Sequence, residues 1–168
     1  MTPANIFIAQ SSVDRGQYFF CTLPADLLNR VQPFLGLCVR LYVSWQFLLS
    51  GYLKLSNWEN TLYLFEYEYR TPILSPSMAA VVGTAGELAF PVLLVLGLAG
   101  RLSALGLFAV NAMAVIAYAH VLYSEGFEAA IGQHYLWGFM LLTLAVYGPG
   151  ALSIDRVLSR RVRPAGKV

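Results

Sequence analysis

Four apolar stretches separated by short connections constrain this chain more than any other feature of its sequence. They run over residues 34 to 55, 77 to 98, 102 to 122 and 133 to 147, with ends good to a few residues. A helix of about 20 apolar residues crosses the hydrocarbon core of a bilayer. With 58% hydrophobic and 12% charged residues, the 168-residue chain has too few charges to cover a water-soluble domain. We therefore predict an all-α integral membrane protein that contacts the lipid bilayer, a four-transmembrane-helix bundle.

The connection between the first two stretches is aromatic rather than apolar. Trp58, Leu62, Phe65 and Tyr69 recur at helical spacing, while charged residues occupy another face. This pattern favours a short interfacial helix over residues 58–70, lying between helices 1 and 2.

Three parts follow from the composition along the chain: an N-terminal arm at 1–25, a four-helix membrane domain at 26–155 and a basic tail at 156–168. Asp26 is placed to cap a short helix, and Pro33 precedes the first apolar run. The N-terminus has no basic stretch followed by a short apolar core and a cleavage site, so no removable signal peptide is predicted.

Basic residues set the predicted orientation. The tail carries Arg156, Arg160, Arg161, Arg163 and Lys167, and Arg101 lies between helices 2 and 3. The other two connections are mainly acidic. By the positive-inside rule both termini should be cytoplasmic, and the basic tail indicates this placement rather than nucleic-acid binding.

The two cysteines, Cys21 and Cys38, are far apart and form no C-x-x-C motif. This excludes a disulfide framework or zinc knuckle, and we expect reduced, inert thiols and no metal. No haem-attachment, phosphate-loop, nucleophile-elbow or zincin motif is present, so no intrinsic cofactor and no catalytic residue is predicted.

Two charged residues fall well inside the apolar stretches. Arg40 lies about 9 Å from the start of helix 1, and Glu87 about 15 Å down helix 2, at the helical rise of 1.5 Å per residue. Charges at such depth normally face protein or water and have a partner. We predict an Arg40–Glu87 ion pair, either as part of a functional site or as a bridge that only locks helix packing.

Lys54 shares a face of helix 1 with Arg40, Ser44 and Gly51, because the fourteen residues from Arg40 to Lys54, at 100° each, nearly complete four turns. Small residues such as Gly51 on this face allow close helix approach. Lys54 either joins a polar cluster or extends its amine to the outer interface.

Helices 3 and 4 contribute three further polar residues. Asn111 is expected to form interhelical hydrogen bonds, whereas His120 points to the opposite side of helix 3 at its outer end. His134 opens helix 4 on a seam of small residues and is either inward-facing or an interfacial cap.

The predicted polar cluster contains Lys54, His120 and His134 near the outer surface with Glu87 deeper. An aromatic loop with Trp58, Tyr63, Tyr67 and Tyr69 would lie above them. Histidine, a carboxylate and aromatic rings beside lipid suit a quinone head group, which needs hydrogen bonds and a proton source. The same residues equally suit a membrane interface.

Several short motifs follow one another between residues 34 and 160. They are Arg40, Ser50-Gly51-x-x-Lys54, Gly86-Glu87-Leu88, Gly97-x-x-x-Arg101, the helix breaker Gly148-Pro149-Gly150 and Ser153-x-Asp155. In this order and spacing they resemble the DoxX family of small four-helix bacterial membrane proteins. The resemblance implies the same fold, the bacterial inner membrane and a role beside other membrane or redox proteins, since the family name comes from a subunit associated with quinone-linked thiosulfate oxidation. It transfers no catalytic motif.

Three functions are weighed on these grounds. The leading one is a subunit of a quinone-linked membrane oxidoreductase, whose partner supplies or receives electrons. The alternative is a non-enzymatic assembly or stress-response scaffold, in which the buried charges only hold the bundle together. A small-solute transporter is disfavoured by the lack of an inverted repeat in the sequence.

Overall fold

The structure is a computed structural model that describes the backbone of residues 4–162 and the side chains of residues 27–159. The described elements are the helices α1 (Ala4–Ser56), α2 (Trp58–Tyr67), α3 (Pro76–Leu96), α4 (Gly100–Ala117), α5 (Ala119–Leu122), α6 (Glu128–Tyr147) and α7 (Ile154–Val162). Four helical segments are long and apolar enough to cross a membrane: Leu27–Ser56 of α1, and α3, α4 and α6. The prediction of a multi-pass, all-α protein with a short helix between the first two spans is confirmed.

The chain divides into two units, Met1–Leu35 and Gly36–Val168, which meet within α1. In the first unit the described backbone is helical, so Asp26 and Pro33 lie inside α1 and do not mark helix starts, contrary to the prediction. A proline removes one backbone hydrogen bond, and a helix in apolar surroundings can continue through it. The side chains of the predicted arm, including Cys21, lie outside the described residues, as do those of Arg160, Arg161, Arg163 and Lys167.

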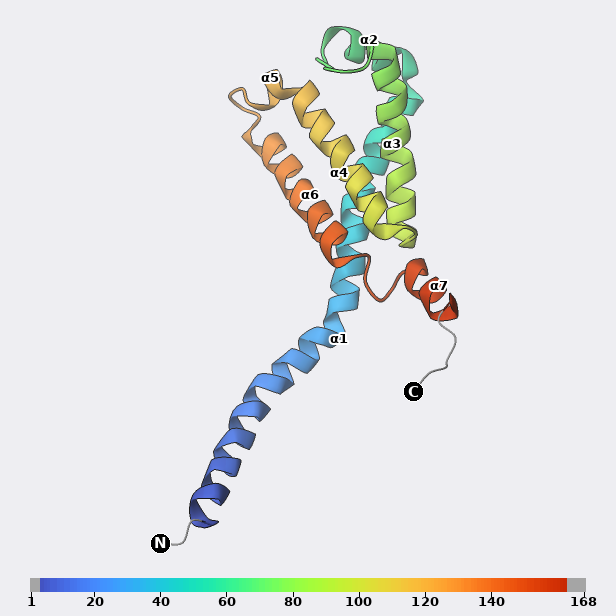
Figure 1. Ribbon diagram of the computed structural model, residues 1–168. Coiled ribbons are helices and arrows are strands. Elements are labelled where there is room, and N and C mark those ends of the chain that lie inside the picture. The colour runs from blue at the N-terminus through green and yellow to red at the C-terminus, as the bar shows by residue number, and fades with distance from the viewer. Residues whose placement is uncertain (1–3, 163–168) are drawn as a thin grey trace. The chain divides into compact units, whose positions relative to one another are not determined.

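The second unit holds the helical bundle (Figure 1). α4 packs against both α3 and α6. The core between them is completed by α1, whose Val43 and Phe47 contact Leu94, Leu107 and Leu141. Large apolar side chains elsewhere on these helices are exposed, as expected for surfaces that face lipid. In Figure 1, α2 and α5 lie at one end of the bundle and α7 at the other, and we call these the α2 end and the α7 end.

Two helix boundaries differ from those expected. The stretch 102–122 is interrupted at Tyr118, because the backbone amide of Arg70 donates to the Ala117 carbonyl at 2.8 Å and takes an acceptor that a continuous helix would use. α6 begins at Glu128 rather than near residue 133. α7 was not predicted.

Two glycines allow the helices to approach closely. A Cβ atom on Gly51 would lie 2.9 Å from the Leu88 side chain, and one on Gly86 would lie 2.8 Å from Val110. Any larger residue at these positions would push α1 from α3, or α3 from α4.

Candidate functional site

At the α7 end, the buried guanidinium of Arg40 binds backbone carbonyl groups. Nη1 donates to the Pro149 carbonyl at 2.6 Å, and Nη2 donates to those of Leu152 at 2.8 Å and Val95 at 3.2 Å. Val95 belongs to the last turn of α3, whose carbonyls lack helical partners and carry partial negative charge. Arg40 therefore supplies a hydrogen bond to a carbonyl at the end of α3 and holds the segment that follows α6 in place.

The predicted Arg40–Glu87 ion pair is wrong. Gly51 is level with Glu87, because a Cβ on Gly51 would lie 3.1 Å from the Glu87 Cβ. Arg40 lies eleven residues before Gly51 in α1, or about 16 Å from that level toward the α7 end. The prediction measured depth from the helix ends, but Glu87 lies eleven residues after the start of α3, whereas Gly51 lies only five residues before the end of α1 at Ser56. Glu87 therefore meets a later part of α1 than Arg40.

The turn after α6 is held by backbone geometry and by Asp155. Gly148 and Gly150 adopt φ values of 86° and 81°, which favour glycine, and they flank the Pro149 carbonyl that Arg40 binds. The Asp155 carboxylate accepts hydrogen bonds of 2.8 Å from the amides of Ala99 and Gly100, at the start of α4. The α7 end is thus a closed set of side-chain-to-backbone bonds.

Toward the α2 end, Lys54 forms the ion pair with Glu87. The amine donates to Oε1 at 2.8 Å and to Oε2 at 2.7 Å, and its third hydrogen bond goes to the Ser50 hydroxyl at 2.8 Å. Because the two side chains are only 18% and 9% exposed, Lys54 does not extend to the interface, which was one of its two predicted roles. It turns inward to a buried carboxylate.

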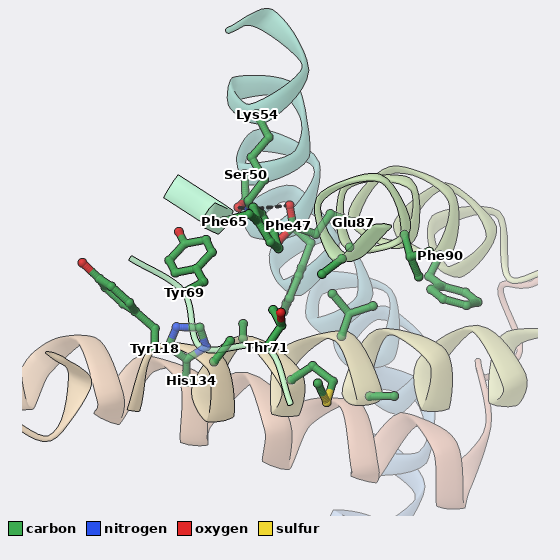
Figure 2. A pocket seen from close by; sticks show the side chains of 18 of the residues that line it. Phe47, Ser50, Lys54, Phe65, Tyr69, Thr71, Glu87, Phe90, Tyr118 and His134 are labelled. Atoms are coloured by element: carbon green, nitrogen blue, oxygen red, sulfur yellow. Dashed lines mark hydrogen bonds and ion pairs between the residues drawn. The ribbon is translucent and has the colours of Figure 1, made fainter. Parts of the chain in front are cut away.

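This ion pair lines a cavity of about 530 Å³ (Figure 2). Its walls are mainly apolar and come from the six helices α1 to α6 and from the loop after α2. Its chemically active side chains are Lys54, Tyr69, Glu87 and His134, with Tyr118 beside them. The sequence prediction grouped Lys54, Glu87 and His134, and the structure places all three around one space.

His134 is held by Asn111. The ring Nδ1 lies 2.8 Å from the Asn111 Oδ1, and the Asn111 amide nitrogen donates to the His134 backbone carbonyl at 3.0 Å. The ring also packs edge-on against Trp137, with 5.0 Å between ring centroids. Asn111 joins α4 to α6, as expected for an interhelical hydrogen-bonding residue.

His120 does not join the cluster. It is exposed on α5, where its ring contacts Tyr118 edge-on at 5.6 Å between centroids. Tyr63 and Tyr67 pack on each other at 4.8 Å and are likewise exposed. Of the predicted aromatic loop, Tyr69 is the residue that reaches the cavity lining.

α2 and the first residues of the loop after it, which we call the cover of the cavity, are hydrogen-bonded to the bundle at two points. The Thr61 hydroxyl donates to the Lys54 carbonyl at 2.8 Å, and the Arg70 amide donates to Ala117. Between them Tyr69 packs edge-on against Phe65 and Tyr118. Burial, and to a lesser extent Tyr118, raises the pKa of Tyr69, so its phenol stays protonated and able to donate a hydrogen bond.

Sequence reasoning missed several residues of this region. Trp137 and Tyr118 line the cavity, yet each reads as an ordinary apolar residue of its helix. The Asn111–His134 contact was also missed, although Asn111 was predicted to bond between helices and an inward-facing His134 was one of its two predicted placements. Asp155 was noted only within a motif.

The DoxX family model matches residues 35–120, just over half of the chain, and the chain therefore belongs to the DoxX family. No curated protein sequence and no solved structure matches it. The matched range includes Arg40, Lys54, Glu87 and Asn111, whereas His134 and Asp155 lie beyond it.

Proposed function

We propose that this DoxX membrane protein binds a membrane quinone in the cavity near its α2 end and serves as a subunit of a quinone-linked redox complex. The observation that supports the proposal is the cavity lining, which combines apolar walls with Lys54, Tyr69, Glu87 and His134. A quinone has an apolar body and ring oxygens that need hydrogen bonds and protons. The partner subunit would supply or accept the electrons.

The size and depth of the cavity suit such a ligand. Small-molecule sites have volumes of about 300–1,000 Å³ with mostly apolar linings and few polar groups, and this cavity measures about 530 Å³. An ionisable pair kept between membrane-spanning helices is costly unless it is used or well paired. The Tyr69 phenol adds a protonated donor at the cover.

Trp137 provides a direct test, since it lines the cavity. In a variant with Trp45→Phe and Trp58→Phe, Trp137 is the remaining tryptophan of the three. We expect a decyl-substituted benzoquinone, titrated into this variant in lipid nanodiscs, to quench Trp137 fluorescence saturably. Quinone analysis of protein purified from native membranes, with identification of co-purifying proteins, tests the same proposal in the cell.

Two glycine substitutions separate cavity binding from partition into lipid. At Gly83 a Cβ would lie 3.7 Å from Phe65, an ordinary contact, and both residues line the cavity, so Gly83→Met should fill it and abolish saturation. At Gly132 a Cβ meets no atom within 4 Å, so Gly132→Met should leave binding unchanged. If quenching is unsaturable, or equal in both variants, the quinone proposal fails and the scaffold alternative is favoured.

A further inference from the structure

The hydrogen-bonding groups around the cavity distinguish between the two redox forms of a quinone. Resting on the function proposed above, we propose that the site selects the reduced dihydroxy form. In this arrangement His134 Nε2 and a carboxylate oxygen of Glu87 accept the two ring hydroxyl hydrogens.

The tautomer of His134 follows from its contacts with Asn111. A backbone carbonyl only accepts hydrogen bonds, so the atom of Asn111 that lies 3.0 Å from the His134 carbonyl must be the amide nitrogen. Oδ1 of Asn111 then faces the ring at 2.8 Å, and because Oδ1 also only accepts, Nδ1 of His134 must carry the hydrogen. In the neutral ring, Nε2 is left as a hydrogen-bond acceptor.

Nε2 is the ring nitrogen available to a ligand. Asn111 takes Nδ1, while no described residue hydrogen-bonds Nε2, and His134 belongs to the cavity lining. Figure 2 shows the imidazole among the side chains that line the cavity, which also include Lys54 and Glu87. Trp137 restricts the tilt of the ring through its edge-on contact.

On the opposite wall, Glu87 again leaves acceptor capacity free, while the Ser50 hydroxyl accepts from Lys54 and keeps one hydrogen that it can donate. The three hydrogens of the Lys54 ammonium are directed to Ser50 and to the two oxygens of Glu87. Each Glu87 oxygen keeps a further lone pair after binding Lys54. A quinone offers only carbonyl acceptors to His134 Nε2 and the Glu87 oxygens, whereas a quinol offers each of these acceptors a hydroxyl donor.

The charge balance agrees with an uncharged ligand. Lys54 and Glu87 neutralise each other within 2.7 Å, so the pair neither attracts an anion nor requires one. A neutral quinol adds hydrogen bonds without disturbing this ion pair. The Tyr69 phenol can both donate and accept, and therefore does not oppose either form.

Two measurements test the proposal. Because the chain has two histidines, a His120→Gln variant with ¹⁵N-labelled histidine gives nuclear magnetic resonance signals from His134 alone. We expect a protonated Nδ1 and an unprotonated Nε2. The second measurement is competition: decyl-benzoquinol, added without oxygen, should displace the matching quinone from the Trp137 reporter with a Kd about tenfold lower, the effect of one added hydrogen bond near 1.4 kcal/mol.

Variants identify which residue sets the preference. Asn111→Leu removes the group that fixes the tautomer, so the His134 signals should show mixed tautomers and the quinol preference should fall. His134→Phe and Glu87→Gln should each reduce the ratio of the quinone Kd to the quinol Kd. His134→Phe removes an acceptor, and Glu87→Gln adds a donor. His120→Gln should leave the ratio unchanged.

The outcomes separate this inference from the function on which it rests. If both forms bind and quinone binds as tightly as quinol or tighter, quinone binding stands and the quinol assignment is overturned. A protonated Nε2 in the free protein overturns it as well. If neither form binds, the proposed function fails and the ligand assignment fails with it, while the tautomer is still read from the magnetic resonance signals.

Discussion

The two ends of the bundle treat buried charge in different ways. At the α7 end, Arg40 is bound by three carbonyl groups and Asp155 by two amides, so each charge is met by the backbone. Toward the α2 end, Lys54 and Glu87 are met by each other, with an open cavity beside them. The charged groups at the α7 end are committed to backbone partners, whereas the ion pair toward the α2 end lines a mainly apolar cavity.

This difference assigns different roles to residues of the same chemical type. A guanidinium that joins the end of α3 to the turn after α6 holds together segments that are distant in sequence, and its loss unpairs several buried carbonyls at once. A lysine beside a cavity can exchange one partner for another. We therefore expect substitutions at the α7 end to change stability without changing ligand affinity, whereas those around the cavity should change ligand affinity whether or not they also change stability.

The largest expected effect is that of Arg40→Met. It removes all three hydrogen bonds of the guanidinium to buried carbonyls, and we expect a loss of about 3 kcal/mol or more in unfolding free energy. Thermal unfolding in detergent and the yield of folded protein from membranes measure it. Arg40→Lys keeps the charge without the planar guanidinium, so its unfolding free energy should lie between those of the wild type and Arg40→Met.

One result for Arg40→Met would contradict the distinction between a structural α7 end and a ligand-binding cavity. If Arg40→Met unfolds at the wild-type temperature but no longer binds quinone, the residue serves the ligand and the α7 end is not a purely structural region. Quinone affinity of the folded fraction should instead equal that of the wild type.

Separating Lys54 from Glu87 should have the next largest effect on stability. Glu87→Gln leaves the ammonium with a neutral partner, which we expect to cost about 2 kcal/mol, less than for a fully enclosed pair because the two side chains are partly exposed. The double variant Lys54→Met with Glu87→Gln should regain part of this loss. Equal losses in the single and double variants would show that the two side chains are not coupled.

The sequence predicted the architecture better than the site. Apolar stretches identify membrane spans because lipid requires apolar side chains and internally bonded backbone over the whole bilayer thickness. The partner of Glu87 depends on how far α3 extends past the end of α1, and no periodicity within a single helix reports such an offset. The carbonyls that bind Arg40 are equally hidden, since every residue carries the same backbone group.

Some of the site could still be read from residue types. Lys54, Glu87 and His134 were grouped because ionisable residues are rare in apolar stretches, and that rule depends on composition alone. His120 was grouped with them on the same ground but is exposed on α5, because the helix breaks at Tyr118 before reaching it. The cavity itself arises from packing among six helices and their connections, which single-helix patterns cannot describe.

A moderate effect is expected from Asp155→Ala. The substitution leaves the amides of Ala99 and Gly100 without their carboxylate, and loss of such a helix-terminal acceptor costs about 1 kcal/mol. Asp155→Asn retains one acceptor and should lose less. Both are measured by thermal unfolding, and quinone affinity should not change. A quinone-binding defect at wild-type stability would show that the α7 end communicates with the cavity.

The smallest effect is expected where a histidine lies outside both regions. His120 is exposed, and its described side-chain contact is the edge-on packing with Tyr118, so His120→Gln should alter unfolding free energy by less than about 0.5 kcal/mol. His134→Gln, by contrast, breaks the Nδ1 hydrogen bond to Asn111 and alters the cavity wall. Parallel titrations of both variants with the quinone should therefore show weakened binding for His134→Gln alone. Equal weakening by the two substitutions would place the ligand against Tyr118 and α5, outside the space between Glu87 and His134.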